Sequence, residues 1–415
     1  MLSDPLIKPP QSKSNVPHAW SAVGAMTLCV AMLIASEFMP VSLLTPIAAD
    51  LKATEGMAGQ AISVSGFFAV VTSLFIASFA ARFDRRYVLM GLTVVMLASL
   101  ALIATAPNFA VLMAARALLG ITVGGFWALA TATIMRLVPD ESVPKALGML
   151  YTGNAMATAF AAPLGSYLGG IIGWRGVFWA LTPIVLANLI WQWLSLPSMP
   201  PERAIPVTRV LGLLKRRSVA FAMAGVMLTF GGAFAVFTYL RPFLETHTHV
   251  SVPQLSLLLL ALGVAGFVGT YGASTLLRSH LNALLIGLPI ALAVVSLGLL
   301  ALGHSLGGVA IMMFLWGAIN AAIPVTWSTW LTREIRDEPE AGGGLMVAAI
   351  QLAIMLGAAF GGFLLDRVSI TATFVGGAVL LALAAMTLVY QRRTHSSGDE
   401  TEGAVNSTGS VPVES

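Results

Sequence analysis

The chain contains a long series of apolar stretches, and this feature restricts its fold more than any other. A helix needs about 20 apolar residues to cross the hydrocarbon core of a bilayer. Twelve such stretches follow one another, at about 21–47, 57–80, 86–105, 109–132, 145–170, 175–195, 219–244, 253–277, 281–302, 307–331, 343–365 and 369–390. Charged residues make up only 10% of the chain, whereas a soluble domain carries about 25%. The sequence therefore predicts an all-α membrane protein with twelve transmembrane helices.

One long polar break divides these stretches into two groups of six. It is rich in proline and ends in the basic run Lys215-Arg216-Arg217. Two halves joined in this way are typical of transporters built from structural repeats. We expect a cytoplasmic N-terminal tail, an N-terminal half, a cytoplasmic linker, a C-terminal half and a disordered cytoplasmic tail, at 1–18, 19–195, 196–218, 219–391 and 392–415.

The distribution of basic residues predicts the orientation. If the N-terminus is cytoplasmic, most of the 22 Lys and Arg residues fall on the cytoplasmic side, and the outer loops hold only Lys52, Arg175, Arg241 and Arg367. Positive residues favour the inner side of a membrane, so both termini are expected to be cytoplasmic. The same asymmetry accounts for the net charge of +4. We therefore expect a lipid bilayer around the chain and no nucleic-acid partner.

Two charged residues fall inside predicted helices rather than in loops. Glu37 lies in the first helix and Arg116 in the fourth, both in the predicted outer half of the membrane. An intramembrane charge costs at least about 2.5–3.5 kcal/mol and needs a partner or a cavity. One interpretation is a static ion pair between the two helices. The other is proton coupling, in which Glu37 gains and loses a proton beside Arg116, with Pro40 loosening the backbone nearby.

The sequence lacks the patterns of an enzyme or of an ATP-driven pump. The six His residues lie in tails or loops, and the one near pair, His247 and His249, has no third ligand beside it. There is no Walker A pattern. The only cysteine, Cys29, lies in an apolar run and is interpreted as a small buried hydrophobe. We expect no enzymatic activity, no metal and no cofactor, so transport would be driven by an ion gradient or by the substrate's own gradient.

The loop before the third predicted helix reads Ala81-Arg82-Phe83-Asp84-Arg85-Arg86. It resembles the Asp-Arg-x-Gly-Arg-Arg loop of the major facilitator superfamily, without the leading and internal glycines. This resemblance implies that Asp84, Arg85 and Arg86 stabilise one conformation of the transporter rather than bind substrate.

Two further motifs resemble those of the same superfamily. The fourth predicted helix contains Arg116-x-x-x-Gly120-x-x-x-Gly124. The fifth contains Pro163-x-Gly165, similar to the antiporter motif of the drug:proton antiporters, with alanine instead of the usual glycine before the proline. The resemblance implies a twelve-helix fold of two halves and a role for Pro163 and Gly165 in conformational change.

A closer resemblance extends over roughly residues 18–391. Segments such as EFMPVSLLTPIAADL (37–51), IGWRGVF (172–178), FTYLRP (237–242) and WSTWLTR (327–333) are similar to bacterial purine ribonucleoside efflux pumps. This implies an antiporter in the bacterial inner membrane that exports inosine and guanosine in exchange for protons, and we expect it to act as a monomer. Efflux of sugars, or of drugs such as chloramphenicol, by the same mechanism remains an alternative. A membrane sensor that transports nothing is a third.

A purine ribonucleoside would need aromatic faces for stacking and amides that can pair with its edge. Six residues within predicted helices have these properties: Phe126, Trp127, Asn154, Trp316, Asn320 and Gln351. Trp316 and Asn320 are four apart and therefore share a helix face. Each of the six has an alternative role in helix packing or facing lipid. Tyr239 and Arg241, near the outer end of the seventh helix, are candidates for gating the exit, although Arg241 fits an ordinary interfacial position equally well.

Overall fold

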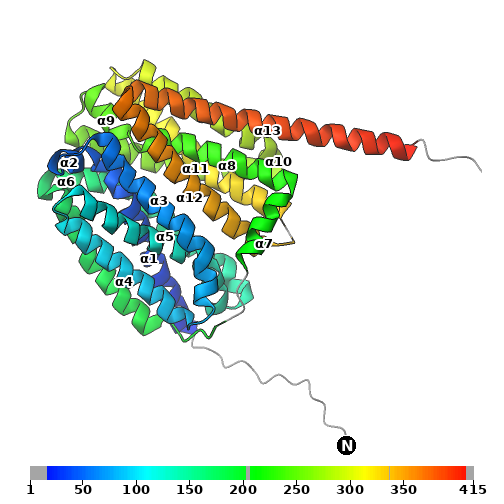
Figure 1. The fold of residues 1–415 in the computed structure, drawn as a ribbon, viewed down its shortest axis with the longest axis horizontal. Coiled ribbons are helices and arrows are strands. Elements are labelled where there is room, and N and C mark those ends of the chain that lie inside the picture. Colours follow the sequence, from blue (N-terminus) through cyan, green and yellow to red (C-terminus); the bar gives the residue numbers. More distant parts are fainter. Residues whose placement is uncertain (1–15, 202–205, 336, 408–415) are drawn as a thin grey trace, which may run out of the picture.

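The protein is described by a computed structural model that covers residues 16–201, 206–335 and 337–407 (Figure 1). Within these ranges the regular structure is entirely helical. The long helices are α1 (Val16–Ser42), α3 (Glu55–Ala80), α4 (Arg85–Thr105), α5 (Phe109–Leu137), α6 (Val143–Ser195), α8 (Arg217–Phe237), α10 (Val252–Ala301), α11 (Leu306–Glu334), α12 (Pro339–Arg367) and α13 (Ile370–Ser407). Short helices are α2 (Leu44–Asp50), α7 (Val207–Gly212) and α9 (Leu240–Thr246), with 3-10 turns at Asp140–Ser142 and Leu213–Lys215.

Eleven helical segments of the described chain are long and apolar enough to span a membrane. One of them, Lys145–Ser195, contains 51 residues. At about 1.5 Å per residue, this is more than twice the thickness of a hydrocarbon core of about 30 Å. Its backbone leaves the helical conformation at Gly173, where φ is 72°. Because the segment turns there and crosses again, the described part of the chain makes the twelve passes that the sequence predicts.

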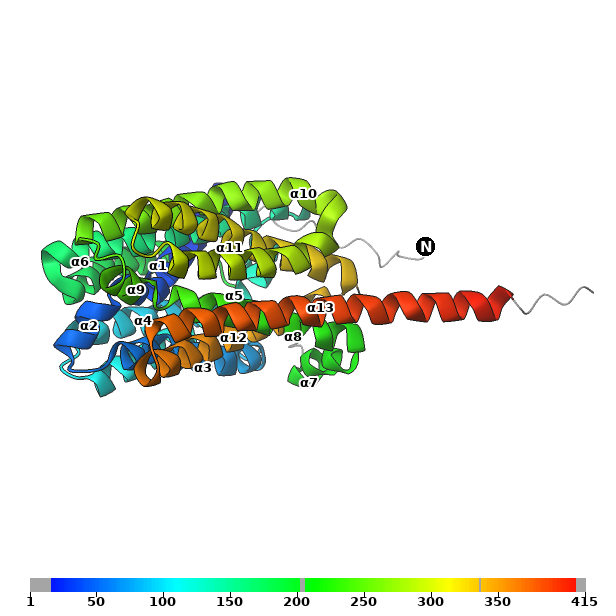
Figure 2. The same cartoon turned by 90° about the horizontal axis from the view of Figure 1, so that it is seen from above.

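The ends of the chain differ in part from the predicted tails. Almost all of the tail predicted at 1–18 lies outside the described residues, and α1 begins at Val16. At the other end, α13 continues to Ser407, through the first part of the stretch for which disorder is predicted. No proline occurs between 392 and 407, so every residue of this stretch keeps the N–H that helical hydrogen bonding needs. Figure 2 shows this end of α13 projecting beyond the other helices.

Each half has an apolar core of its own. One core consists of buried residues between Ala22 and Met199, and the other consists mainly of residues between Leu213 and Leu388. Close approach of α5 to α3 depends on glycine in the fourth-helix motif. A Cβ atom on Gly120 would lie 2.1 Å from the Ser65 carbonyl oxygen, and one on Gly124 would lie 2.0 Å from that of Ala69. These contacts allow only glycine, which explains the small-residue spacing in the sequence.

The first helix of each half is interrupted at a matching position. The break between α1 and α2 lies at Leu43 (φ −115°, ψ 10°), and the break between α8 and α9 lies at Tyr239 (φ −111°, ψ 18°). In each half a proline follows three residues after the break, Pro46 in the first and Pro242 in the second. A proline cannot donate a backbone hydrogen bond to the preceding turn, so both helices are weakened at the same point.

The two halves meet closely at the end of the bundle formed by α2, α9 and residues 51–56 and 366–369, called here the α2–α9 end. There the Thr54 hydroxyl donates to Asp366 Oδ2 at 2.6 Å, and further along α3 Ser63 donates to the Met355 carbonyl at 3.0 Å. In Figure 1 the helices of the two halves converge near α2 and α9 and run in different directions toward the opposite end, which carries the linker. The structure is therefore closed at the α2–α9 end.

Candidate functional site

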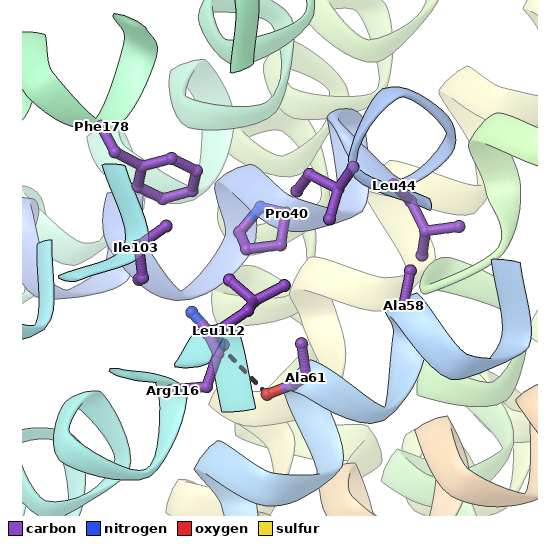
Figure 3. A pocket seen from close by; sticks show the side chains of 9 residues that line it. Pro40, Leu44, Ala58, Ala61, Ile103, Leu112, Arg116 and Phe178 are labelled. Atoms are coloured by element: carbon purple, nitrogen blue, oxygen red, sulfur yellow. Dashed lines mark hydrogen bonds between the residues drawn. The ribbon is translucent and has the colours of Figure 1, made fainter. Parts of the chain in front are cut away.

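Arg116 is fully buried within the N-terminal half and bonds to backbone carbonyls of two other helices. Its Nε donates to the Ala61 carbonyl of α3 at 3.1 Å, and its Nη1 donates to the Ser36 carbonyl of α1 at 3.0 Å. A longer contact of 3.4 Å joins Nη2 to the Glu37 carbonyl. Figure 3 shows the Arg116 guanidinium and its hydrogen bond to the Ala61 carbonyl. Arg116 therefore ties α1, α3 and α5 together.

Pro40 explains why the Ser36 carbonyl is available to Arg116. In an α-helix this carbonyl would accept from the N–H of the residue four positions later, which is Pro40. Proline has no N–H, and an unpaired carbonyl is costly inside a membrane. The guanidinium supplies the missing donor. The guanidinium therefore bonds to the α1 backbone and does not form the static ion pair with Glu37 that one interpretation predicted. Glu37 and Arg116 still interact electrostatically.

The pocket beside Arg116 is too small for a nucleoside. Apart from Arg116 it is lined by apolar residues of the N-terminal half, including Pro40, Leu112 and Phe178 (Figure 3). Its volume is about 10 Å³, which is room for about one water molecule. This side of Arg116 is part of the packing of the half and is not a substrate chamber.

Glu37 faces the other half of the protein. Its side chain is 3% exposed, and it lies within interaction range of the Gln351 amide on α12. Gln351 is itself 8% exposed, and its Nε2 has no hydrogen-bond partner of good geometry. A buried acid of one half and a buried amide of the other thus lie next to each other. The sequence singled out both residues, but only the fold brings them together.

Aromatic rings continue from Glu37 into the C-terminal half. Phe38 of α1 contacts Phe234 and Phe237 of α8, with ring centroids 5.9 and 6.0 Å apart. Phe237 stacks on Trp316 of α11 at 5.8 Å and an interplanar angle of 9°. The Trp316 Nε1 donates to the Ser296 hydroxyl at 3.1 Å. The sequence pointed to Trp316 but not to the three phenylalanines. Their only signal was position, since Phe38 directly follows Glu37 and Phe234 and Phe237 lie one helical turn apart.

The remaining candidates for substrate binding are Phe126, Trp127, Asn154 and Asn320. Phe126 is fully buried in the core of the N-terminal half, which fits its alternative role in packing. Trp127 is half-buried and stacks on Tyr151 with centroids 6.0 Å apart. Asn154, nearly one turn along α6 from Tyr151, and Asn320, one turn from Trp316, are both half-buried. The structure therefore places Trp316 and Gln351, but not Phe126, in the region around Glu37 and its aromatic neighbours.

The family model of the Major Facilitator Superfamily matches residues 26–345 of this chain. The chain belongs to this superfamily. It is thus a multi-pass membrane transporter by family, with the all-helical fold of two six-helix halves. Two solved structures of the same fold are a bacterial homologue of the human lysosomal transporter Spinster (17% identity, TM-score 0.74, 92% of this chain and 98% of that one) and a D-xylose–proton symporter (16% identity, TM-score 0.73, 89% and 97%).

Two curated relatives are similar over nearly the whole chain. The purine ribonucleoside efflux pump NepI of Salmonella enteritidis PT4 is 42% identical over 374 residues, which cover 90% of this chain and 94% of that protein. The protein named transcription regulatory protein OpdE of Pseudomonas aeruginosa PAO1 is 48% identical over 380 residues, covering 91% and 94%. The predicted resemblance to purine ribonucleoside efflux pumps is therefore confirmed as a sequence relationship.

The segment of α6 that resembles the antiporter motif lies against the break in the first helix. A Cβ atom on Gly165 of α6 would lie 2.7 Å from the Ser42 hydroxyl oxygen, and one on Gly169 would lie 2.4 Å from Leu43 Cδ2. Pro163 lies inside the same helix. Small residues on α6 thus let it approach α1 closely at the point where α1 gives way to α2.

At the opposite end of the bundle, the superfamily's loop motif is joined to the linker. Asp84 caps α4 by accepting from the Arg86 amide at 2.9 Å, and it also accepts from the Met199 amide at 2.9 Å and from the Ser198 hydroxyl. Burial acts to raise the pKa of Asp84, but these hydrogen bonds outweigh it and lower the pKa from its ordinary value. The Arg85 amide donates to the Met199 carbonyl at 2.9 Å. Asp84 therefore holds the start of the linker against the beginning of α4.

The gating candidates Tyr239 and Arg241 lie at the α2–α9 end. The Tyr239 hydroxyl donates to the Ala358 carbonyl at 2.9 Å, and the ring is fully buried. A Cβ atom on Gly59 of the other half would lie 2.0 Å from that hydroxyl oxygen, so Tyr239 fills the space that glycine leaves. Arg241 is 7% exposed and donates to the Ser42 carbonyl. The ordinary interfacial role for Arg241 does not fit this burial.

Proposed function

We propose that this transporter is a proton-coupled antiporter that exports purine ribonucleosides such as inosine and guanosine by alternating access. It acts in the bacterial inner membrane with both termini in the cytoplasm. It acts as a monomer, since each half has its own core and the candidate site lies between the halves of one chain. The observation that carries the proposal is the buried Glu37 of α1 beside the buried Gln351 amide of α12.

Proton coupling follows from the surroundings of Glu37. A buried carboxylate is costly inside a membrane, and uptake of a proton removes that cost. The nearby guanidinium of Arg116 is already engaged by backbone carbonyls, so it does not form a direct ion pair that would fix Glu37 in its charged form. Glu37 also lies between the halves, where access to water changes as they move. Its charge state is therefore linked to which end of the transporter is open.

Recognition of a purine is supported by Gln351 and the neighbouring rings. An amide can both donate to and accept from the edge of hypoxanthine or guanine. Phe237 and Trp316 offer stacking faces nearby, and the NepI relatives at 42% identity are named as purine ribonucleoside efflux pumps. A ribonucleoside bound here would contact both halves, so its binding would affect the movement of one half relative to the other.

The energetics of one-for-one exchange are sufficient for export. A neutral nucleoside that leaves as one proton enters is driven by both parts of the proton gradient. The electrical part supplies about 2.3 kcal/mol per 100 mV, and the chemical part about 1.4 kcal/mol per pH unit. Together, at about 100 mV and one pH unit, they sustain a concentration ratio of several hundred-fold, because each 1.4 kcal/mol is a factor of about ten.

The test is Glu37→Gln in inside-out vesicles supplied with labelled inosine and an imposed pH gradient. The variant keeps the shape of the side chain but cannot release a proton, so we expect no gradient-driven accumulation. Exchange of inosine for inosine, which needs no net proton movement, should persist. Glu334→Gln serves as the control, since this acid is exposed at the end of a span. Accumulation by Glu37→Gln driven by the pH difference alone would refute the proton site.

The same vesicles separate the alternatives. If an excess of unlabelled arabinose or chloramphenicol inhibits the uptake of labelled inosine and an excess of guanosine does not, the transporter exports sugars or drugs by the same mechanism. A folded protein that moves none of these compounds would favour the sensor, a possibility that the name of the OpdE relative makes worth testing. We favour transport because a sensor has no evident use for a buried acid at a moving interface.

The proposed orientation is tested with single cysteines at exposed positions. His249 lies in the loop after α9, and Leu214 lies in the linker. A maleimide that does not cross membranes should label His249→Cys in sealed cells and leave Leu214→Cys unlabelled until the cells are opened. The reverse pattern would place both termini outside.

A further inference from the structure

We propose that Arg241 is a latch between the halves: its guanidinium completes a carbonyl that Pro46 leaves unpaired, and the bond must break before the α2–α9 end opens. The inference rests on the alternating access proposed above, and it concerns how one of the two closed states is held. Four groups form the latch, Ser42 and Thr45 of the N-terminal half and Arg241 and Glu245 of the C-terminal half.

The acceptor exists because of the break in the first helix. The Ser42 carbonyl would accept from the N–H four residues later, but that residue is Pro46. Ser42 is fully buried, so water does not compensate. Arg241 Nη1 from α9 donates to this carbonyl across the boundary between the halves. A charged donor to a buried carbonyl is among the stronger hydrogen bonds available to a protein.

Glu245 fixes the direction of the Arg241 side chain. Arg241 Nε donates to Glu245 Oε1 at 2.8 Å, one helical turn away. The other carboxylate oxygen of Glu245 accepts from the Thr45 hydroxyl at 2.6 Å. Glu55 also lies near that hydroxyl, at 3.0 Å, but Glu245 is the closer of the two. The contacts thus run from α2 to Glu245, to Arg241 and back to the end of α1, with both charges neutralised.

The latch residues occupy equivalent places in the two halves. Thr45 and Arg241 each lie two residues after the helix break and directly before the proline that follows it. Closing the α2–α9 end therefore brings these two positions into the same region. The device also repeats the one inside the N-terminal half, where Arg116 completes the carbonyl freed by Pro40. The difference is that the Arg116 bond stays within one half, whereas the Arg241 bond joins parts that must separate.

The test measures opening of the α2–α9 end directly. Ala49 of α2 and Thr246 of α9 are exposed, and each is changed to cysteine in a Cys29→Ser background to carry a spin label. Double electron–electron resonance then gives the populations of short and long distances in the purified full-length protein. For Arg241→Gln we expect the ratio of long to short distances to rise at least about tenfold, as loss of a strong charged hydrogen bond implies.

Pro46→Ala separates the latch from a simple ion pair. Alanine supplies the missing N–H within the helix, so the Ser42 carbonyl no longer needs Arg241, and this variant alone should also raise the long-distance population. The double variant should be no more open than the more open single variant, because both changes remove the same bond. Multiplying effects, or wild-type distances in Arg241→Gln, would overturn the latch.

One further variant keeps the test decisive. Arg241→Lys retains the charge but cannot bond to Ser42 and Glu245 with a fixed fork, so we expect an intermediate population. If Arg241→Gln does not yield a monodisperse protein, Arg241→Lys and Pro46→Ala still decide, and wild-type distances in both would refute the proposal. The measurement uses neither nucleoside nor proton gradient. Failure of inosine transport would therefore count against the proposed function and leave the latch result standing.

Discussion

Arg116→Gln is expected to destabilise the N-terminal half, and part of the loss should be recovered by Pro40→Ala. The guanidinium makes two good hydrogen bonds, of 3.0 and 3.1 Å, to the Ser36 and Ala61 carbonyls. A hydrogen bond from a charged donor contributes about 1.5–3 kcal/mol. The shorter glutamine amide can replace at most one of the two, so we expect the free energy of unfolding to fall by about 2–4 kcal/mol.

Pro40→Ala tests the physical reason for this loss. Alanine restores the N–H that the Ser36 carbonyl would otherwise lack, and a backbone hydrogen bond contributes about 1 kcal/mol. The double variant should therefore be more stable than the sum of the two single changes by about 1 kcal/mol or more. Reversible unfolding in mixed micelles, followed by tryptophan fluorescence, gives the four free energies that the comparison needs.

The control for general loss of an arginine is Arg209→Gln. This side chain is 63% exposed and forms an ion pair with Glu338, so its removal should change stability by less than about 1 kcal/mol. Strict additivity of Arg116→Gln and Pro40→Ala would refute the reasoning, because it would mean that Arg116 does not support the carbonyl freed by proline. A loss of equal size in Arg209→Gln would show that the assay reports charge removal in general.

Two further predictions concern the packing of the helices and the linker end. Gly124→Ala places a Cβ atom 2.0 Å from the Ala69 carbonyl oxygen and should destabilise the fold by about 1–3 kcal/mol, whereas Gly148→Ala, with open space around it, should be neutral or slightly stabilising in the same unfolding assay. Asp84→Asn should slow inosine transport while leaving inosine affinity within a few-fold; loss of binding in a folded protein would contradict a gating role. Because the pKa of Asp84 is lowered, its contribution is complete above the ordinary value of 3.8 and is lost only as pH falls through the lowered one. Transport by wild type and Asp84→Asn should therefore show the same pH profile between about pH 5 and 8.

The arrangement of passes could be predicted from the sequence because the bilayer imposes a length on every helix. Hydropathy and turn residues located all twelve passes, including the pair that runs through Gly173. The prediction of disorder from residue 392 was made from composition, and the structure instead continues α13 to Ser407. Composition describes the tendency of an isolated segment, whereas this segment extends a helix already formed in the membrane.

The sequence also singled out Glu37 and Arg116, since a charge in an apolar stretch needs a reason wherever it lies. It could not assign their partners. The carbonyl that Arg116 completes is recognisable only when α5 is known to lie beside Pro40. Gln351 is more than 300 residues from Glu37 along the chain, and no local pattern relates them.

Local pattern determined which residues of this protein lie in the membrane and which of them are out of place there, because both follow from the transfer of individual side chains into lipid. The tertiary structure alone decided that Phe126 is packed within one half while Trp316 is close to the boundary between the halves. It also decided that Arg241 crosses that boundary to a carbonyl left free by a proline. Such contacts depend on which helices become neighbours, and helix neighbours are set by the packing of the whole chain rather than by any segment of it.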